Sequence, residues 1–158
     1  MANHQGRNEV GRRKQRLAAT FEKIDGQGLS PELTAHYSRY LCVLVSGYAE
    51  QSVKELVNHY CRSKSEPRIQ RYVGTQVKKV RNIDAEKLKQ LVQSFDTAWW
   101  DELSVKYRDE LPAFDSVATL RNGISHGSDS GITMSTVTQY FNQISTVLDA
   151  LCDVLDPP

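Results

Sequence analysis

The longest helical pattern in this sequence begins at Ser30, and it constrains the fold more than any other feature. The stretch "SPELT" has the residues of a helix start: serine suits the N-cap, proline the first helical position, and Glu32 the positive end of the helix dipole. Apolar residues then recur every three or four positions to about Cys61, which predicts one long helix. Around residues 40–49 this helix is apolar on more than one side, a pattern that suits the centre of a bundle or a dimer seam.

Other segments repeat the helical spacing, and no alternating strand pattern extends beyond a few residues. Prolines, capping residues and breaks such as "SKSEP" predict where these helices begin and end. The expected segments run from about Arg12 to Ile24, from Pro67 to about Val80, from Ala85 with Asp84 as its cap, through "TAWWDELSVKY", from Pro112 to about Leu120, and from a cap at Ser135 or Thr136 to Leu155. The pattern predicts an all-α protein, a bundle of four to five helices.

Residues 1–12 lack apolar periodicity, so we expect a flexible basic tail there and a single helical domain over 13–158. The cluster "GRRKQR" (11–16) either contacts nucleic acid or solvates the start of a helix. The sequence has no hydrophobic N-terminal segment, and the apolar run "LCVLV" is far too short to cross a bilayer. We therefore expect a cytoplasmic protein without a membrane partner.

Motifs for metal or cofactor chemistry are missing from the sequence. The three cysteines, Cys42, Cys61 and Cys152, are widely spaced, with no CxxC pair and no histidine at zinc-ligand spacing, so free thiols are expected. There is no glycine-rich phosphate loop, HExxH helix or serine nucleophile elbow. We expect no cofactor and no metal site.

The formal net charge of +1 conceals an asymmetry along the chain. Residues 1–95 contain 17 Lys and Arg against 9 Asp and Glu, whereas residues 96–158 contain 3 against 10. Such a division suits a half that binds a polyanion, or self-association of opposite faces, but two solvated faces would give the same pattern. Charge alone slightly favours the solvated faces.

The stretch "TLRNGISHGSD", residues 119–129, brings Arg121, Asn122 and His126 close together in the chain. A guanidinium binds phosphate through two hydrogen bonds, and an imidazole exchanges protons at neutral pH. With an orienting amide, these groups suffice for RNA cleavage without a metal. If the helix continues through the motif, Arg121 is turned away from His126 by roughly 140°, so two chains meeting at a twofold axis would bring them together. An ordinary helix end, with His126 in a loop, accounts for the same residues.

The segment "LRNGISHG" (120–127), followed by a turn and a final amphipathic helix, resembles the motif of the HEPN superfamily. Ribonuclease members of that superfamily carry an arginine, a polar residue and, after a short spacer, a histidine; Arg121, Asn122 and His126 occupy those places. The upstream order is also similar, with "SGYAEQSVKEL" in a long helix and "FDTAWWDEL" after a variable helical middle. The resemblance covers about residues 30–156 and is closest to the RiboL-PSP-HEPN group.

This resemblance implies a HEPN-type bundle that forms a homodimer, with the motifs of both subunits facing one cleft. It implies a metal-independent endoribonuclease that leaves a 2′,3′-cyclic phosphate and acts as a toxin or antiviral defence effector, with RNA and an antitoxin or other regulatory protein as partners. His126 would act as acid or base, Arg121 would bind and stabilise phosphate, and Asn122 would support both. Glu50 would orient Arg121, although a solvent-facing Glu50 fits the sequence equally well. The alternative is a catalytically silent RNA- or nucleotide-binding or dimerisation module.

A basic segment upstream of the motif offers a second contact for RNA. Its cations would extend a phosphate track from the cleft, with an affinity that depends on salt. A solvated helix face, or a docking surface for an acidic antitoxin, explains the same charges, and the sequence does not choose among them. The residues are Arg68, Arg71, Lys78, Lys79 and Arg81.

Overall fold

The computed structural model describes residues 4–127 and 131–158, and within them the chain is all-α, as the sequence predicts. This part of the chain contains seven helices rather than four or five, because the middle of the sequence divides into short pieces. Their bounds are α1 Gln5–Asp25, α2 Pro31–Lys64, α3 Pro67–Val77, α4 Ala85–Gln93, α5 Thr97–Lys106, α6 Pro112–Ser125 and α7 Met134–Leu155.

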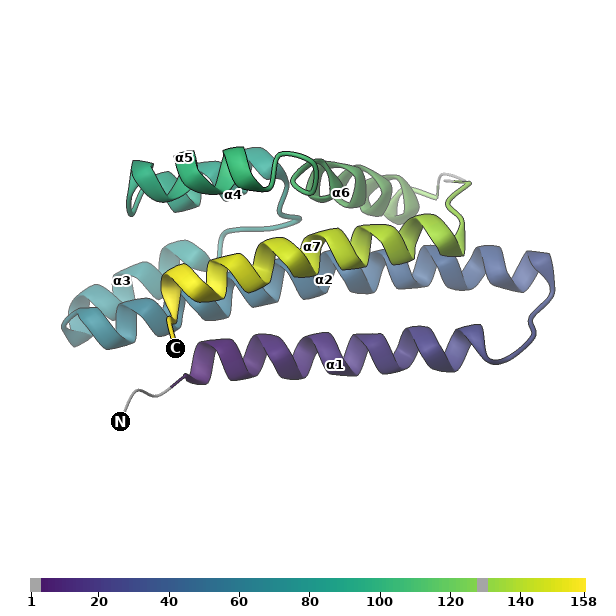
Figure 1. The fold of residues 1–158 in the computed structure, drawn as a ribbon, viewed down its shortest axis with the longest axis horizontal. Helices are drawn as coiled ribbons and strands as arrows, with labels where there is room; N and C mark the ends of the chain where they lie inside the picture. The colour runs from purple at the N-terminus through teal and green to yellow at the C-terminus, as the bar shows by residue number, and fades with distance from the viewer. Residues whose placement is uncertain (1–3, 128–130) are drawn as a thin grey trace.

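α2 is the axis of the bundle, and it contacts α1, α3, α6 and α7. Figure 1 shows α1, α2 and α7 as long rods running roughly side by side, with α4, α5 and α6 forming a layer above them. The C-terminal end of α6 and the N-terminal end of α2 lie at the same end of the molecule, where α2 extends beyond the other helices (Figure 1). The end of α6 is therefore positioned by its packing on α2.

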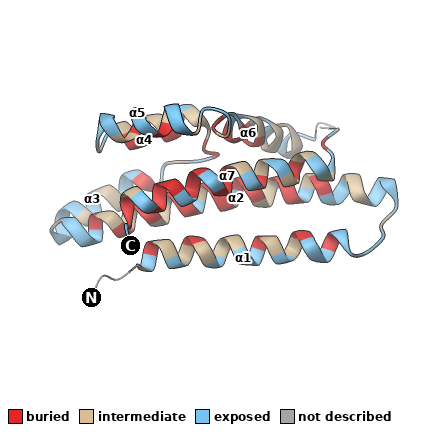
Figure 2. Ribbon diagram, viewed as in Figure 1, coloured by how far each residue is buried: buried red, intermediate tan, exposed pale blue. Residues whose placement is uncertain are grey.

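The long helix forms as predicted from its first turn. The Ser30 hydroxyl oxygen accepts a hydrogen bond from the Leu33 N–H at 3.3 Å, which satisfies one of the free donors at the helix start. Leu41, Val45 and Leu56 are fully buried along this helix. Figure 2 shows that burial concentrates on α2 and α7, so the core follows these two helices.

Two other helix starts test the predicted caps. Asp84 Oδ1 accepts a hydrogen bond from the Lys87 N–H at 2.8 Å, which confirms the cap of α4. α7 is capped by Thr133, whose Oγ1 accepts from the Thr136 N–H at 3.2 Å, so the prediction of Ser135 or Thr136 was wrong. All three residues carry hydroxyls that suit an N-cap, and residue type alone did not separate them.

The first helix is longer than the sequence indicates. α1 begins at Gln5, so residues 5–12 are helical rather than part of a flexible tail; residues 1–3 of that expected tail lie outside the described residues. No side chain caps the start of α1. Val10 is only 1% exposed, and it anchors this first part of the helix in the core.

A buried carboxylate at the other end of the chain holds the start of α1 in place. Asp156 Oδ2 accepts a hydrogen bond from the Arg7 N–H at 2.7 Å, and Oδ1 lies 3.3 Å from His4 Nδ1 and 3.4 Å from His59 Nε2. Burial by itself would raise the pKa of Asp156, but the Arg7 N–H, His4 and His59 hold it below its usual value. This cluster joins α1, α2 and the end of α7, which explains a helix start without a local cap.

None of the helices in the described residues is both long and apolar enough to span a lipid bilayer. Cys42, Cys61 and Cys152 are buried free thiols, as the sequence predicts. Burial raises the pKa of Cys42 and of Cys152 to about 11, so both stay protonated at neutral pH. The cysteines therefore belong to the packing of the core.

Candidate functional site

The Arg–Asn–His motif lies at the C-terminal end of α6. The helix continues to Ser125, and the His126 N–H donates a hydrogen bond to the Asn122 carbonyl oxygen at 3.1 Å. Gly127 follows with a φ of +79°, a conformation that glycine adopts readily, and the helix ends there. The turn expected after the motif falls mostly on residues 128–130, outside the described residues.

The register of α6 separates the three side chains. Asn122 and His126 are one turn apart, so they share a face of the helix, and both are exposed. Arg121 follows the buried Val117 and Ala118 by one turn, so it lies at the edge of the packed face and is half-buried. Because the helix persists, Arg121 and His126 are about 140° apart around its axis, and α6 alone does not aim both at one phosphate.

The side chains of Arg121, Asn122 and His126 have no partner within the described residues. Among residues 4–127 and 131–158, the Arg121 guanidinium, the Asn122 amide and the His126 imidazole form no hydrogen bond or ion pair. Arg7, by contrast, donates to Asp153 at 2.7 Å. Because no carboxylate among the described residues pairs with this half-buried guanidinium, it is open to a phosphate oxygen.

Glu50 is held by groups other than Arg121. Its Oε1 accepts a hydrogen bond from Lys54 Nζ at 2.9 Å, and its Oε2 accepts from the Asn82 N–H at 2.7 Å. Burial by itself would raise the pKa of Glu50, but these two bonds and the charge of Arg81 hold it below its usual value. The side chain is only 14% exposed, so it does not face solvent either. We therefore do not retain Glu50 as the residue that orients Arg121.

Asn82 connects this part of α2 to α6. It is buried with a φ of +48°, a left-handed conformation that asparagine tolerates better than most residues. Its side-chain N–H donates to the Ala118 carbonyl oxygen at 3.1 Å, and its side-chain oxygen accepts from the Ser46 hydroxyl at 3.3 Å. These bonds fix α6 against α2 only three residues before Arg121. No pattern in the sequence indicated this role, because the partners are far apart along the chain.

Replacing Glu50 by alanine is expected to lower the free energy of unfolding by about 1–3 kcal/mol, because the Lys54 ammonium and the Asn82 N–H lose their acceptor. The folded pKa of Glu50 lies below its ordinary value of 4.5, so this stabilisation is present at neutral pH and is lost as the pH falls through the folded pKa. Urea denaturation at pH 7 and at about pH 3 measures it. The exposed Glu102→Ala is the control, with a change of about 0.5 kcal/mol or less. A change in the free energy of unfolding for Glu50→Ala as small as that of the control would contradict the role of Glu50 as acceptor for Lys54 and Asn82.

Two adjoining hollows lie along the solvent-facing side of α2. The first, between α1 and residues 43–51 of α2, has a volume of about 350 Å³. The second has a volume of about 400 Å³ and lies between α1, α2 and the turn that follows α3. Arg13 and Gln51 line both hollows, so the two form one depression along α2.

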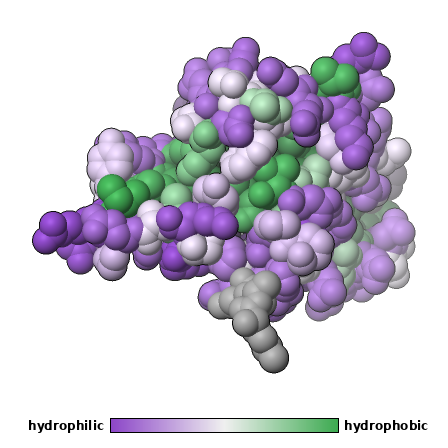
Figure 3. All heavy atoms as spheres, turned by 60° about the vertical axis from the view of Figure 1, so that its left-hand side comes forward, coloured by the Kyte–Doolittle hydropathy of each residue, from purple (hydrophilic) through white to green (hydrophobic). Residues whose placement is uncertain are grey.

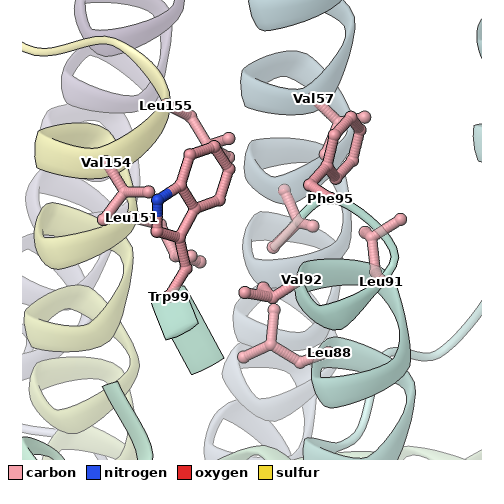
Figure 4. Close-up of a pocket in the computed structure, with 10 residues that line it drawn as sticks. Val57, Leu88, Leu91, Val92, Phe95, Trp99, Leu151, Val154 and Leu155 are labelled. Atoms are coloured by element: carbon pink, nitrogen blue, oxygen red, sulfur yellow. The ribbon is translucent and has the colours of Figure 1, made fainter. Parts of the chain in front are cut away.

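A third hollow, enclosed by α2, α4, α5 and α7, does not suit a ligand. Its volume is about 10 Å³, about that of one water molecule, and only apolar side chains line it. Figure 4 shows the Trp99 ring beside Val154 and Leu155 of α7, with Phe95 on the other side of the gap. Figure 3, which brings forward the end carrying α3 and α5, shows hydrophobic side chains in a band across that face. The lining of this third hollow is apolar, whereas charged side chains line the second hollow beside α1.

The five cations expected to bind RNA are all exposed, but they do not all line one hollow. Lys78 and Arg81 line the second hollow beside α2. Lys79 borders a neighbouring hollow, which Arg81 also lines. Arg68 and Arg71 lie on α3 and line neither hollow.

Two further cations complete the lining of the second hollow. Arg13 comes from α1 and belongs to the "GRRKQR" cluster, which the sequence marks as basic without locating its target. Lys54 comes from α2, and sequence reasoning missed it. Its position four residues after Glu50 is the spacing of a helical ion pair, and that signal could have predicted the bond between them.

The N-terminal half of α2 presents an exposed apolar stripe near the end of α6. Leu33, Tyr37 and Tyr40 are spaced by four and three residues, so they share one face of the helix, and they are 47%, 39% and 52% exposed. Exposed apolar side chains gathered on one helix face are typical of a contact with another chain. The apolar pattern at residues 40–49 that suggested a bundle centre or a dimer seam overlaps this stripe only at Tyr40. Leu41, Val45 and Tyr48 of that stretch are buried in the core of the bundle.

The matches to known proteins agree with this structure. A family model described as RiboL-PSP-HEPN matches residues 8–156, which include all of α2 to α7 and most of α1. No curated protein and no solved structure matches the chain. Because the match spans nearly the whole sequence, and the fold is all-α with the Arg–Asn–His motif at the end of α6, the chain belongs to the RiboL-PSP-HEPN family of HEPN domains.

Proposed function

We propose that this protein is a metal-independent endoribonuclease that acts as a toxin or antiviral defence effector under the control of an antitoxin or other regulatory protein. HEPN domains are generally nuclease- or RNA-related. The observation that carries the proposal is that Arg121, Asn122 and His126 make no side-chain hydrogen bond or ion pair within the described residues. Asn122 and His126 are exposed and Arg121 is half-buried, so all three side chains are open to a ligand.

In the proposed reaction, the ribose 2′-oxygen attacks the adjacent phosphorus, and the bond from phosphorus to the 5′-oxygen breaks. The products are a 2′,3′-cyclic phosphate and a 5′-hydroxyl. His126 accepts the proton of the 2′-hydroxyl or donates one to the leaving 5′-oxygen. Arg121 binds the non-bridging oxygens and stabilises the added charge of the transition state. Asn122, one turn before His126 on the same face of α6, orients the imidazole or the phosphate.

The proposed site needs a second copy of the chain. A rotation of about 140° separates Arg121 from His126 on α6, whereas a twofold axis beside the helix end would let Arg121 face His126 of the partner subunit. The apolar stripe of Leu33, Tyr37 and Tyr40 supports this arrangement, because it lies on the part of α2 that shares an end of the molecule with the motif (Figure 1). Burying the stripe between two copies would remove these side chains from water.

Incubation of the wild-type protein with a mixed tRNA and mRNA substrate in excess EDTA tests the proposal. The expected result is cleavage at a rate that added Mg²⁺ does not change, with 2′,3′-cyclic phosphate ends. Intact RNA that the protein nevertheless binds would identify a catalytically silent binding module instead. If the RNA is neither bound nor cleaved, the remaining interpretation is a module that serves only in dimerisation.

A further inference from the structure

We propose that a single strand of RNA reaches the site through the second hollow, here named the basic groove and defined by Arg13, Lys54, Lys78 and Arg81. This inference rests on the proposed function, since it identifies where the phosphates of the substrate bind. The four cations come from α1, α2 and the turn after α3. Cations from three separate parts of the fold therefore line one depression of about 400 Å³.

The carboxylates in the basic groove are already neutralised. Glu50 accepts hydrogen bonds from Lys54 and from a backbone N–H, so its charge is compensated locally. Glu55 accepts from Arg62 at 3.0 Å, and Arg62 lies outside the lining of the groove. Neither carboxylate is therefore free to repel an incoming phosphate.

Two of the remaining cations are free to bind an anion. Lys78 and Arg81 are exposed and form no ion pair among the described residues. Arg13 is paired with Glu9 at 3.3 Å. Lys78 and Arg81 are therefore the side chains of this hollow that are open to phosphate oxygens.

A short chain of hydrogen bonds connects the basic groove to the motif. Asn82 follows Arg81 directly, and its N–H donates to Glu50 in the wall of the groove. The Asn82 side chain donates to Ala118 of α6, three residues before Arg121. Three helical residues rise only about 4.5 Å, so these hydrogen bonds link the wall of the groove to the segment of α6 that carries Arg121. The polarity of the groove suits RNA phosphates better than an apolar partner.

The chain contains a matched control for this proposal. Arg68 and Arg71 on α3 are exposed and basic, but they do not line the basic groove. Lys78→Ala with Arg81→Ala removes the same charge as Arg68→Ala with Arg71→Ala. All four side chains are exposed, so both double variants are expected to keep the stability of the parent. A difference in RNA affinity between the two variants therefore reflects where the lost cations lie rather than the loss of net charge.

Both pairs are introduced into His126→Ala, and the affinity for a single-stranded RNA oligonucleotide is measured across a range of salt concentrations. The slope of log affinity against log salt is expected to fall by about 1.4 in the groove variant, roughly 0.7 for each lost phosphate contact, and to stay unchanged in the control. In the otherwise wild-type protein, the groove variant is expected to raise KM for RNA with little change in kcat.

Equal losses in the two double variants, or no loss in the groove variant, would overturn the proposal. The proposal would also be overturned if the groove variant lost binding to an acidic protein while its RNA binding stayed unchanged. The proposed function can fail separately. If the wild type leaves RNA intact in EDTA while only the groove variant loses RNA affinity, RNA binding in the basic groove is supported and the nuclease activity is contradicted. If the wild type cleaves RNA and the groove variant binds RNA normally, the nuclease activity is supported and RNA binding in the basic groove is contradicted.

Discussion

His126→Ala is expected to lower kcat/KM for RNA cleavage by a factor on the order of 10²–10⁴, the usual contribution of a general acid or base. The side chain is exposed and makes no hydrogen bond within the described residues, so its removal costs the fold little. RNA affinity is expected to stay close to that of the wild type, because Arg121 and the basic groove remain. Initial cleavage rates and oligonucleotide binding, measured on the same preparations, separate the two effects.

His36→Ala is the matched control for this prediction. His36 is also an exposed helical histidine, but its imidazole contacts Arg39 at 2.6 Å on α2 and is not part of the motif. The control is expected to retain cleavage at the wild-type rate. A His126→Ala variant that cleaves as fast as His36→Ala would show that His126 does not transfer the proton.

The mixed dimer of Arg121→Ala and His126→Ala chains is expected to cleave RNA, although each variant alone is inactive. If Arg121 acts with His126 of the partner subunit, one of the two symmetric sites in the mixed dimer keeps both groups. The activity should then return to about half of the wild-type rate for each dimer. Co-expression with two different tags, followed by purification through both, isolates the mixed species.

Arg108→Ala paired with His126→Ala is the control for the mixed dimer. Arg108 is exposed, 84% in its side chain, and lies between α5 and α6, outside the motif. This dimer keeps both Arg121 side chains and one His126, so it is expected to be active and sets the reference rate. A mixed Arg121→Ala and His126→Ala dimer as inactive as its parents, beside an active reference, would place both groups in the same chain.

The elements that were predicted correctly are those whose signals are local. Ser30 and Pro31 determine the start of α2 through contacts within a few residues, and Asp84 does the same for α4. The start of α1 has no such signal, because it depends on Asp156, 149 residues from Arg7 along the chain. Apolar periodicity does not reveal a helix that is anchored by residues at the far end of the sequence.

The same distinction applies to the candidate site. The place of Arg121, Asn122 and His126 at a helix end follows from the apolar pattern before them and from Gly127 after them. The partners of Glu50 depend instead on the turn that carries Asn82, which tertiary packing brings back to α2. Linear clustering also grouped cations that the fold separates into the basic groove, a neighbouring hollow and the outer face of α3.

The most direct measurement uses two RNA oligonucleotides in excess EDTA that differ only in the 2′-oxygen of the cleaved nucleotide. We expect that the all-ribose strand is cut to a 2′,3′-cyclic phosphate and a 5′-hydroxyl, and that the strand with a single 2′-deoxy position is bound equally well but left intact. Cleavage of the 2′-deoxy strand at the same bond, or cleavage of either strand only when a divalent metal is added, would contradict 2′-hydroxyl attack at the Arg121–His126 site.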